Sequence, residues 1–258
     1  MKICWFTTGK DKNAFILFRD VCEAIEDGVI DGSIALVFLN RDKHESEHSD
    51  MIMTHAEERS IPVVTVSTTK FLRDHNLSLS NGRGYFDAEV LDRIKQFDFD
   101  IVFLAGYMLI ISPVIFTAYP VLNIHPSLPG EYKGRWDEVI NRAIDDRRRS
   151  FGAMIHLVEE VLNEGPPVAF ARIAPKEREI RDLYRQAQAG DRPARVRLFN
   201  AIRAREFEVE RPLIIQSLSL VSKGVIQIKD GAVYYKGKQA KGGVDVTAEV
   251  LDWQRKDK

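Results

Sequence analysis

The sequence predicts an open, mostly parallel α/β sheet with flanking helices and a C-terminal extension made of helices and a hairpin. Short apolar runs alternate with helical patterns over the first two-thirds of the chain, which is typical of strand–helix–strand units. After about Pro175 the chain becomes charge-rich and helical, and near its end Asp230-Gly231 separates two strand-like runs. We therefore expect a main domain over residues 1–175, with residues 176–258 packing on it.

The predicted elements follow the chain in order. The strands are expected at residues 2–8, 33–40, 62–66, 100–104, 121–125, 151–158 and 167–173. The helices are expected at residues 13–26, 50–59, 86–96, 113–118 and 136–145. In the extension we expect helices at 176–188 and 194–211, an apolar helix at 212–221 and a hairpin at 224–235. Asn13 and Ser112 are the expected N-caps of their helices.

Composition restricts the class of partner. The 258 residues carry a formal net charge of −1, which gives no reason to expect nucleic acid or an anionic membrane. No apolar run approaches 18 residues, and the N-terminus has no signal-peptide pattern. Cys4 and Cys22 are expected to be reduced and buried. The sequence indicates a cytoplasmic protein, and a homodimer stays open.

The most informative stretch is Asn123-Ile124-His125-Pro126-Ser127-Leu128-Pro129-Gly130, at the end of a predicted strand. Residues two apart on a strand share a face, so an amide donor would lie beside a titratable imidazole. Acyl transfer to an amine needs a donor to the developing oxyanion and a group that moves protons near neutral pH. The alternative is a structural histidine bonded to a turn carbonyl, beside an asparagine that caps the loop.

Two other strand ends have the character of ligand sites. Residues 9–13 join the first strand to a helix, and a helix N-terminus with Lys10 and Lys12 nearby suits an anion. Residues 104–110 contain Gly106, which permits close backbone approach, followed by apolar side chains that suit a flat ligand. For residues 9–13 taken alone, an ordinary strand–helix connection capped by Asn13 is the preferred interpretation. For residues 104–110, a buried strand end that packs on its helix is equally consistent with the pattern.

A mixed-charge run at residues 41–50 contains two histidines among several acids. A metal site needs convergent geometry that such a run rarely supplies, so a solvated loop is the preferred interpretation. We expect His156, inside a predicted strand, to be a packed core histidine.

In this order, the motifs resemble the catalytic domain of the 10-formyltetrahydrofolate-dependent formyltransferases, and within them the phosphoribosylglycinamide formyltransferases. The resemblance covers about residues 1–173, with a weaker continuation at 212–231. It is carried by Thr8-Gly9 with Asn13, by Leu104-Ala105-Gly106-Tyr107-Met108, by Asn123-Ile124-His125-Pro126-Ser127-Leu128, and by the segment from Gly152 to Pro166. It implies a Rossmann-like catalytic domain over 1–175.

The resemblance also implies roles for individual residues. In the catalytic group, Asn123 would bind the formyl oxygen, His125 would act as general acid, and Asn163 stands at the position of the family's catalytic aspartate. The residues expected to bind the amine substrate are Gly9, Lys10, Asp11, Lys12, Asn13, Glu206 and Glu210. The residues expected to bind the folate are Arg83, Met108, Leu109, Ile110, Ile111, Glu159 and Glu160. The one-carbon donor would be 10-formyltetrahydrofolate, and no metal is expected.

The sequence departs from the family pattern at several of these positions. Asp11-Lys12 replaces a usual Gly-Ser, and Leu109 stands where an arginine is common. Asn163 has no proton to exchange and does not favour a charged imidazole as a carboxylate would. Glu206, Glu208 and Glu210 compete for one expected acidic position.

The resulting function is transfer of a formyl group to a primary amine, with glycinamide ribonucleotide as the expected acceptor in purine biosynthesis. One alternative keeps the fold and the donor but uses another acceptor, such as an amino sugar nucleotide or water. A second alternative, suggested by Asn163, is a catalytically impaired protein that binds folate or nucleotide.

Overall fold

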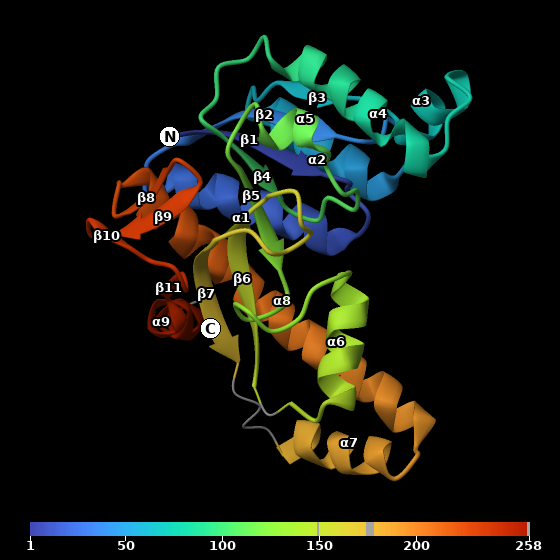
Figure 1. Cartoon of the computed structure of the whole chain (residues 1–258), viewed down its shortest axis with the longest axis vertical. Coiled ribbons are helices and arrows are strands. Elements are labelled where there is room, and N and C mark those ends of the chain that lie inside the picture. The colour runs from blue at the N-terminus through green and yellow to red at the C-terminus, as the bar shows by residue number, and fades with distance from the viewer. Residues whose placement is uncertain (149, 174–177, 257–258) are drawn as a thin grey trace. The chain divides into compact units, whose positions relative to one another are not determined.

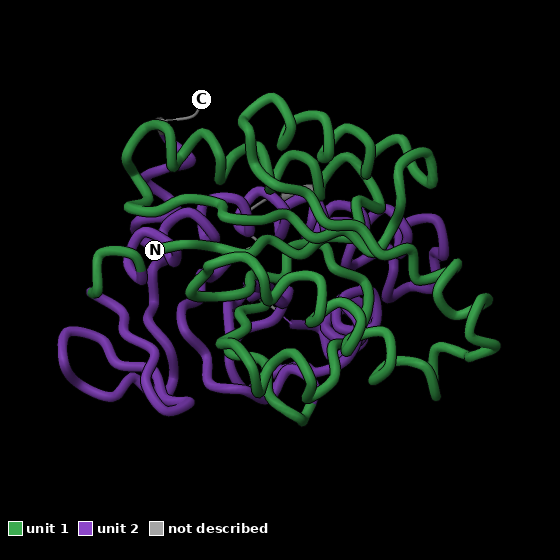
Figure 2. The backbone as a smooth tube through the Cα atoms, turned by 90° about the horizontal axis from the view of Figure 1, so that it is seen from above, with its two compact units in different colours: residues 1–123, 157–161, 222–224 green, residues 124–156, 162–221, 225–258 purple. Residues whose placement is uncertain are grey.

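The computed structural model describes residues 1–148, 150–173 and 178–256, and Figure 1 labels its helices and strands. The chain divides into two compact units, coloured separately in Figure 2. The first unit contains residues 1–123, 157–161 and 222–224, and the second contains residues 124–156, 162–221 and 225–258. Both combine separate stretches of chain. The division expected near residue 175, which lies outside the described residues, stays a prediction.

A parallel sheet forms the centre of the first unit, as predicted. Its strands lie in the order β5-β4-β1-β2-β3, and every neighbouring pair is parallel. The bounds are β1 Lys2–Thr7, β2 Ser33–Leu39, β3 Val63–Thr65, β4 Ile101–Leu104 and β5 Val121–His125, the last two residues of β5 belonging to the second unit. In β1, every residue from Ile3 to Thr7 is buried, which is typical of a strand covered on both faces.

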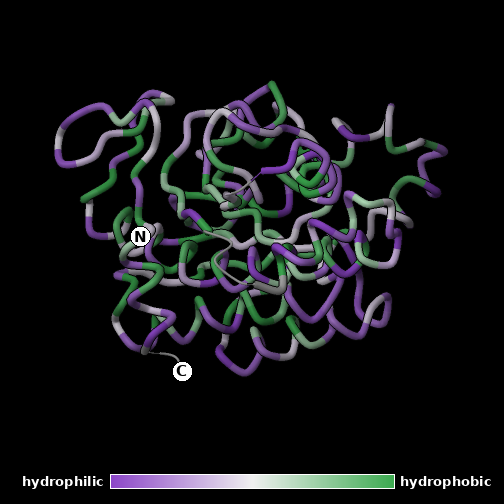
Figure 3. The backbone as a smooth tube through the Cα atoms, turned by 90° about the horizontal axis from the view of Figure 1, so that it is seen from below, coloured by the Kyte–Doolittle hydropathy of each residue, from purple (hydrophilic) through white to green (hydrophobic). Residues whose placement is uncertain are grey.

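Five helices accompany this sheet: α1 Lys12–Glu26, α2 Glu47–Glu58, α3 Thr68–Asp74, α4 Leu79–Ile94 and α5 Pro113–Phe116. Apolar and polar residues alternate along the helical coils (Figure 3), as expected for helices with one face on a core. The helix α3 was not predicted, and α2 begins three residues before its predicted start. Part of the expected solvated loop at residues 41–50 therefore belongs to α2. Ser49 and Ile52 are buried on one face of this helix, which favours the helical conformation.

The second unit contains β6 Phe151–Leu157, apart from Leu157 in the first unit, and β7 Pro167–Ile173, which pairs antiparallel with β6. It also contains β11 Val244–Asp245, which pairs parallel with β7. Its helices are α6 Trp136–Asp145, α7 Arg178–Gln188, α8 Arg192–Ser222, apart from Ser222 in the first unit, and α9 Thr247–Lys256. Of the helix predicted at 176–188, residues 176 and 177 lie outside the described residues. Most strand pairs in the two units are parallel, so the predicted mostly parallel α/β class is confirmed.

The predicted hairpin is present in the second unit. It consists of β8 Ile226–Lys229 and β9 Ala232–Tyr235, extended by β10 Lys238–Gln239. Asp230 and Gly231 have φ angles of 50° and 70°, the pair of positive values that a tight hairpin turn requires.

The helix α8 runs without a break through Pro212, where the sequence predicted two separate helices. Proline has no backbone N–H, so the carbonyl of Glu208, four residues earlier, loses its partner within the helix. The side-chain amide of Gln254, in α9, donates to that carbonyl at 3.0 Å. Burial of Leu213, Ile214 and their neighbours favours the continuous helix as well. No helix in the described part of the chain has both the length and the apolar character that crossing a membrane requires.

Candidate active site

Asn123 and His125 lie on β5, at the carboxyl end of the parallel strands. Asn123 pairs in register with Leu104 at the end of β4. Because strand residues alternate in direction, the two side chains point to the same face of β5. Asn123 is half-buried, whereas His125 is only 3% exposed. Open α/β sheets commonly bind ligands beyond the carboxyl ends of their strands, and these two residues lie at such an end.

The imidazole of His125 is hydrogen-bonded and neutral. Its Nε2 lies 3.0 Å from the carbonyl oxygen of Tyr132, and since a carbonyl only accepts, Nε2 carries the proton. Burial lowers the pKa of His125 to about 4; the bond to Tyr132 opposes this shift and the charge of His156 adds to it. The two histidine rings are 6.2 Å apart, and His156 is buried in β6 as predicted.

The contact with Tyr132 is also the one that a purely structural histidine would make. Tyr132 was missed by the sequence reasoning, because the connection that carries it forms no regular element. A second residue of this connection, Ser127, accepts the N–H of Tyr132 on its Oγ at 3.0 Å. The available signal was Ser127, since serine hydroxyls commonly form hydrogen bonds with nearby backbone groups in turns.

The connection between β1 and α1 is held by backbone and side-chain contacts within the first unit. Gly9 has φ +57°, and a Cβ added there would lie 2.6 Å from the Cα of Ser49, so only glycine fits. Its carbonyl accepts hydrogen bonds from Arg41 at 3.3 Å and from Ser46 at 3.1 Å. The backbone of this loop is therefore firmly placed.

The N-cap of α1 is Asp11, whereas the sequence predicted Asn13. The Asp11 carboxylate accepts the backbone N–H of Asn13 at 3.0 Å and that of Ala14 at 3.3 Å. Aspartate caps helices as well as asparagine does, and its charge is favourable at a helix N-terminus. The backbone N–H groups of Asn13 and Ala14, which an anionic ligand at this helix end would use, are thus already bound to the Asp11 carboxylate. Lys10 and Lys12 are exposed beside it.

The expected folate-binding residues 108–111 follow β4. Gly106 has φ +65°, and the N–H of Met108 donates to Thr8 Oγ1 at 2.9 Å, which fixes the start of the segment. Met108 and Ile110 are 44% and 45% exposed, Leu109 is half-buried and Ile111 is buried. Neighbouring exposed apolar side chains at a strand end suit the face of an aromatic ligand.

Arg83 lies on α4, and its Nε is buried without a hydrogen-bond partner in the described residues. One turn further along α4, the carboxylate of Asp87 accepts the backbone N–H of Ser112 at 2.5 Å. Burial raises the pKa of Asp87, against the opposing effects of Ser112 and Arg83. Ser112 takes the predicted N-cap position of α5, but its side chain makes no capping bond. Asp87 was missed, although its i,i+4 spacing from Arg83 was a readable signal.

The remaining expected residues differ in exposure. Glu159 and Glu160 are exposed in the loop after β6. Asn163 has φ +57°, and its side-chain Nδ2 donates to the carbonyl of Gly134 at 3.0 Å.

The three competing glutamates of α8 differ in burial and in their partners. Glu210 is 4% exposed and forms two bonds with Arg203, at 2.7 and 3.1 Å. Glu206 is 1% exposed, and burial followed by the charge of Glu210 raises its pKa well above the ordinary value. Glu208 is exposed and pairs with Arg205 at 2.5 Å. Only Glu206 and Glu210 are held inside the unit.

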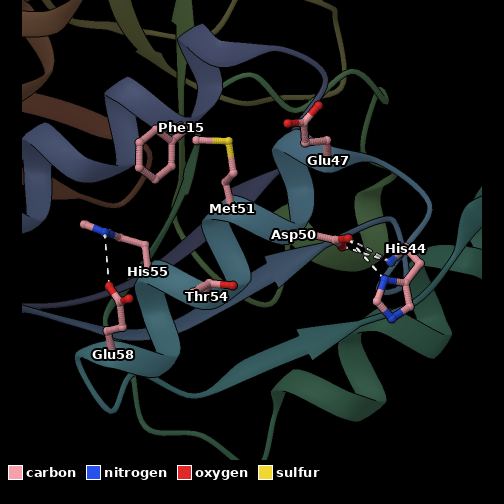
Figure 4. Close-up of a pocket in the computed structure, with 8 residues that line it drawn as sticks. All are labelled: Phe15, His44, Glu47, Asp50, Met51, Thr54, His55 and Glu58. Carbon is pink, nitrogen blue, oxygen red and sulfur yellow. Dashed lines mark hydrogen bonds and ion pairs between the residues drawn. The ribbon is translucent and has the colours of Figure 1, made fainter.

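A groove of about 600 Å³ in the first unit is lined by α2, by Phe15 of α1 and by His44 (Figure 4). Its two histidines do not converge, because His44 faces Asp50 at 3.5 Å while His55 faces Glu58 at 4.0 Å. None of the expected site residues lines it. Among the described residues, no group of three or more His, Cys, Asp or Glu side chains is arranged to hold a metal.

Known proteins resemble this chain in sequence and in fold. A phosphoribosylglycinamide formyltransferase of Haemophilus influenzae is 25% identical over 239 residues, spanning 92% of this chain and 94% of its own length. The chloroplastic enzyme of that name from Arabidopsis thaliana is 29% identical over 170 residues, and the match spans about half of that relative, 52%, and 64% of this chain. The solved structure of the same enzyme from Coxiella burnetii superposes with a TM-score of 0.69 at 21% identity, over 95% of this chain and 98% of that one.

The family comparison agrees with these relatives. The sequence pattern of the Formyl transferase family matches residues 1–192, about three-quarters of the chain. The match includes the β1–α1 loop, the residues after β4, and Asn123 with His125. This chain therefore belongs to the formyl transferase family.

Proposed function

We propose that this protein transfers the formyl group of 10-formyltetrahydrofolate to the amino group of glycinamide ribonucleotide. The observation that carries the proposal is the pair Asn123 and His125 on one face of β5, within the matched family region. The names of the relatives support this acceptor, because the Haemophilus influenzae enzyme of that name matches 92% of this chain.

The chemistry follows from the two side chains. The neutral amine attacks the formyl carbon, a C–N bond forms, and the carbonyl oxygen becomes an oxyanion that the Asn123 amide binds. Because burial keeps His125 neutral, its Nδ1 can accept the proton that the attacking nitrogen releases. When the tetrahedral intermediate collapses, the bond to folate N10 breaks and His125 returns the proton to N10.

The other expected residues would bind rather than react. Met108, Leu109, Ile110 and Ile111 would contact the folate ring, with Arg83 beside it. Residues 9–13 would bind the phosphate of the amine, in competition with the capping carboxylate of Asp11. Glu206 and Glu210 would contact the amine substrate. The expected cytoplasmic location and the homodimer stay predictions.

The test is an acceptor panel with the full chain and 10-formyltetrahydrofolate: glycinamide ribonucleotide, an amino sugar nucleotide, and buffer alone. We expect release of tetrahydrofolate that depends on glycinamide ribonucleotide. His125→Ala should lower kcat by about 10²- to 10⁴-fold while folate binding changes only a few-fold. His75→Ala, on an exposed histidine outside the matched motifs, is the control.

Each other outcome points to a different conclusion. Turnover with the amino sugar nucleotide only would show that the acceptor is wrong, and turnover in buffer alone would indicate a deformylase. Folate binding without turnover on any acceptor would indicate the impaired homologue. Loss of folate affinity in His125→Ala with unchanged kcat would show that His125 is structural.

A further inference from the structure

Residues 128–134 of the second unit, part of the connection that follows His125, are called here the 128–134 loop. Its contact with His125 is the hydrogen bond from Nε2 to the Tyr132 carbonyl, at 3.0 Å. Tyr132 is itself fixed in two further ways: its N–H donates to Ser127 Oγ at 3.0 Å, and its hydroxyl donates to Asp146 at 2.6 Å. The side chain of Tyr132 is thereby attached to the end of α6.

The far end of the 128–134 loop is attached to residues 163 and 164. The Asn163 amide donates to the Gly134 carbonyl at 3.0 Å, and Lys133 forms an ion pair with Glu164. The Lys133 and Glu164 side chains are 54% and 41% exposed, and exposed pairs contribute little to stability. The partly buried bond from Asn163 is therefore the stronger attachment.

An amide suits this position for two reasons, and a carboxylate suits it for only one. The backbone of Asn163 has φ +57°, a left-handed conformation that asparagine and aspartate tolerate better than most residues. The Gly134 carbonyl can only accept a hydrogen bond, so its partner must be a donor. A carboxylate has no proton to donate and would place a negative charge against the carbonyl dipole.

We propose that Asn163 is a positioning residue: its side-chain amide holds the Gly134 carbonyl and the 128–134 loop, so that the Tyr132 carbonyl keeps the proton of neutral His125 on Nε2. This proposal rests on the proposed function in one respect, namely that His125 moves the proton of the reaction. It assigns Asn163 a role that the missing carboxylate could not fill.

The physical consequence concerns the two nitrogens of His125. A fixed acceptor at Nε2 leaves the Nδ1 lone pair available, so one tautomer is ready to accept a proton. If the 128–134 loop loosens, both tautomers become populated and water reaches the ring. Water favours the charged form of an imidazole, which reverses the effect of burial on its pKa. Among the described residues, His156 is the neighbouring histidine, with its ring centroid 6.2 Å from that of His125.

Three variants test the proposal. Asn163→Asp removes the donor and adds a charge, and Asn163→Gly removes the donor while retaining the left-handed backbone. Glu164→Gln is the matched control, because it removes the neighbouring ion pair and leaves the amide. For each variant, ¹⁵N chemical shifts of the His125 ring, titrated with pH, report its tautomer and pKa. kcat and KM for formyl transfer are measured in parallel, with thermal unfolding as the check of folding.

We expect Asn163→Asp and Asn163→Gly to lose the single Nε2-protonated form and to raise the pKa of His125. In both, kcat should fall at least about tenfold, as expected when a general acid–base group loses its alignment, while KM changes less than about threefold. Glu164→Gln should match the parent protein. The proposal is overturned if Asn163→Asp equals or exceeds the parent in kcat, or if the His125 tautomer is unchanged in both variants.

The two readouts keep this proposal distinct from the proposed function. The ring ¹⁵N shifts need no substrate. A protein that transfers formyl to no acceptor, yet loses the His125 tautomer in both variants, would refute the function and support the role of Asn163. A protein that transfers formyl normally, with an unchanged His125 tautomer in both variants, would refute the role of Asn163 and support the proposed function.

Discussion

Replacing Asp11 by asparagine tests how the β1–α1 loop deals with a phosphate. The Asp11 carboxylate accepts the N–H groups of Asn13 and Ala14, at 3.0 and 3.3 Å. A phosphate arriving at this helix N-terminus would compete for those donors and would lie next to a negative charge. Asparagine keeps the capping oxygen and removes the charge, so Asp11→Asn isolates the electrostatic part of the competition.

The magnitude follows from Coulomb's law for an exposed site. Two unit charges about 4 Å apart in water interact by about 1 kcal/mol. A phosphate monoester carries a charge of about −1.5 to −2, so removing the Asp11 charge should strengthen its binding by about 1.5–2 kcal/mol. This corresponds to an affinity about 10- to 30-fold higher. Lys10 and Lys12, both exposed, offset part of the repulsion, so we expect the lower end of that range.

The assay measures Kd and KM for glycinamide ribonucleotide at low and high salt, and Kd for a folate. Asp11→Asn should tighten the phosphorylated amine about tenfold at low salt, less at high salt, and leave the folate unchanged. Its free energy of unfolding should change little, whereas Asp11→Ala should lose about 1 kcal/mol because the cap is gone. Unchanged or weaker binding of the amine to Asp11→Asn would show that the phosphate does not approach this helix end.

Two further predictions concern buried titratable groups. His125 is neutral when folded, with its pKa lowered from 6.5 to about 4. The free energy of unfolding should therefore fall by up to about 3 kcal/mol as the pH drops from 6.5 to 4. Urea unfolding of the parent and of His125→Gln over this range should show this pH dependence in the parent only, and an equal dependence in both would assign it to another group. Burial raises the pKa of Glu206, so its contribution to stability is present below pH 4.5 and is lost as the pH rises through the folded pKa. Glu206→Gln should therefore have a higher free energy of unfolding than the parent at pH 8. Glu208→Gln, at an exposed site, is the control and should match the parent. A lower free energy of unfolding for Glu206→Gln would mean that the ionised carboxylate stabilises the fold.

Much of the fold could be predicted because local patterns and burial agree. The strands β1, β2 and β4 are short, mostly buried apolar runs of the first unit, and β5 begins as one. The hairpin turn at Asp230 and Gly231 follows from residues that accept positive φ. The continuity of α8 through Pro212 could not be predicted. It is favoured by burial of Leu213 and Ile214 and by the Gln254 amide, 46 residues away from the Glu208 carbonyl that it binds.

The candidate site shows the same division. By itself, the sequence determined which residue types stand at the strand ends, including Asn123 and His125. It also determined the family that these motifs indicate. Only the tertiary structure decided the state of those groups: that His125 donates to Tyr132, that Asp11 occupies two N–H groups of α1, and that Asn163 donates to Gly134. The physical reason is that a residue's type fixes what it can donate or accept, whereas its protonation and its partner depend on burial and on groups brought near by the fold.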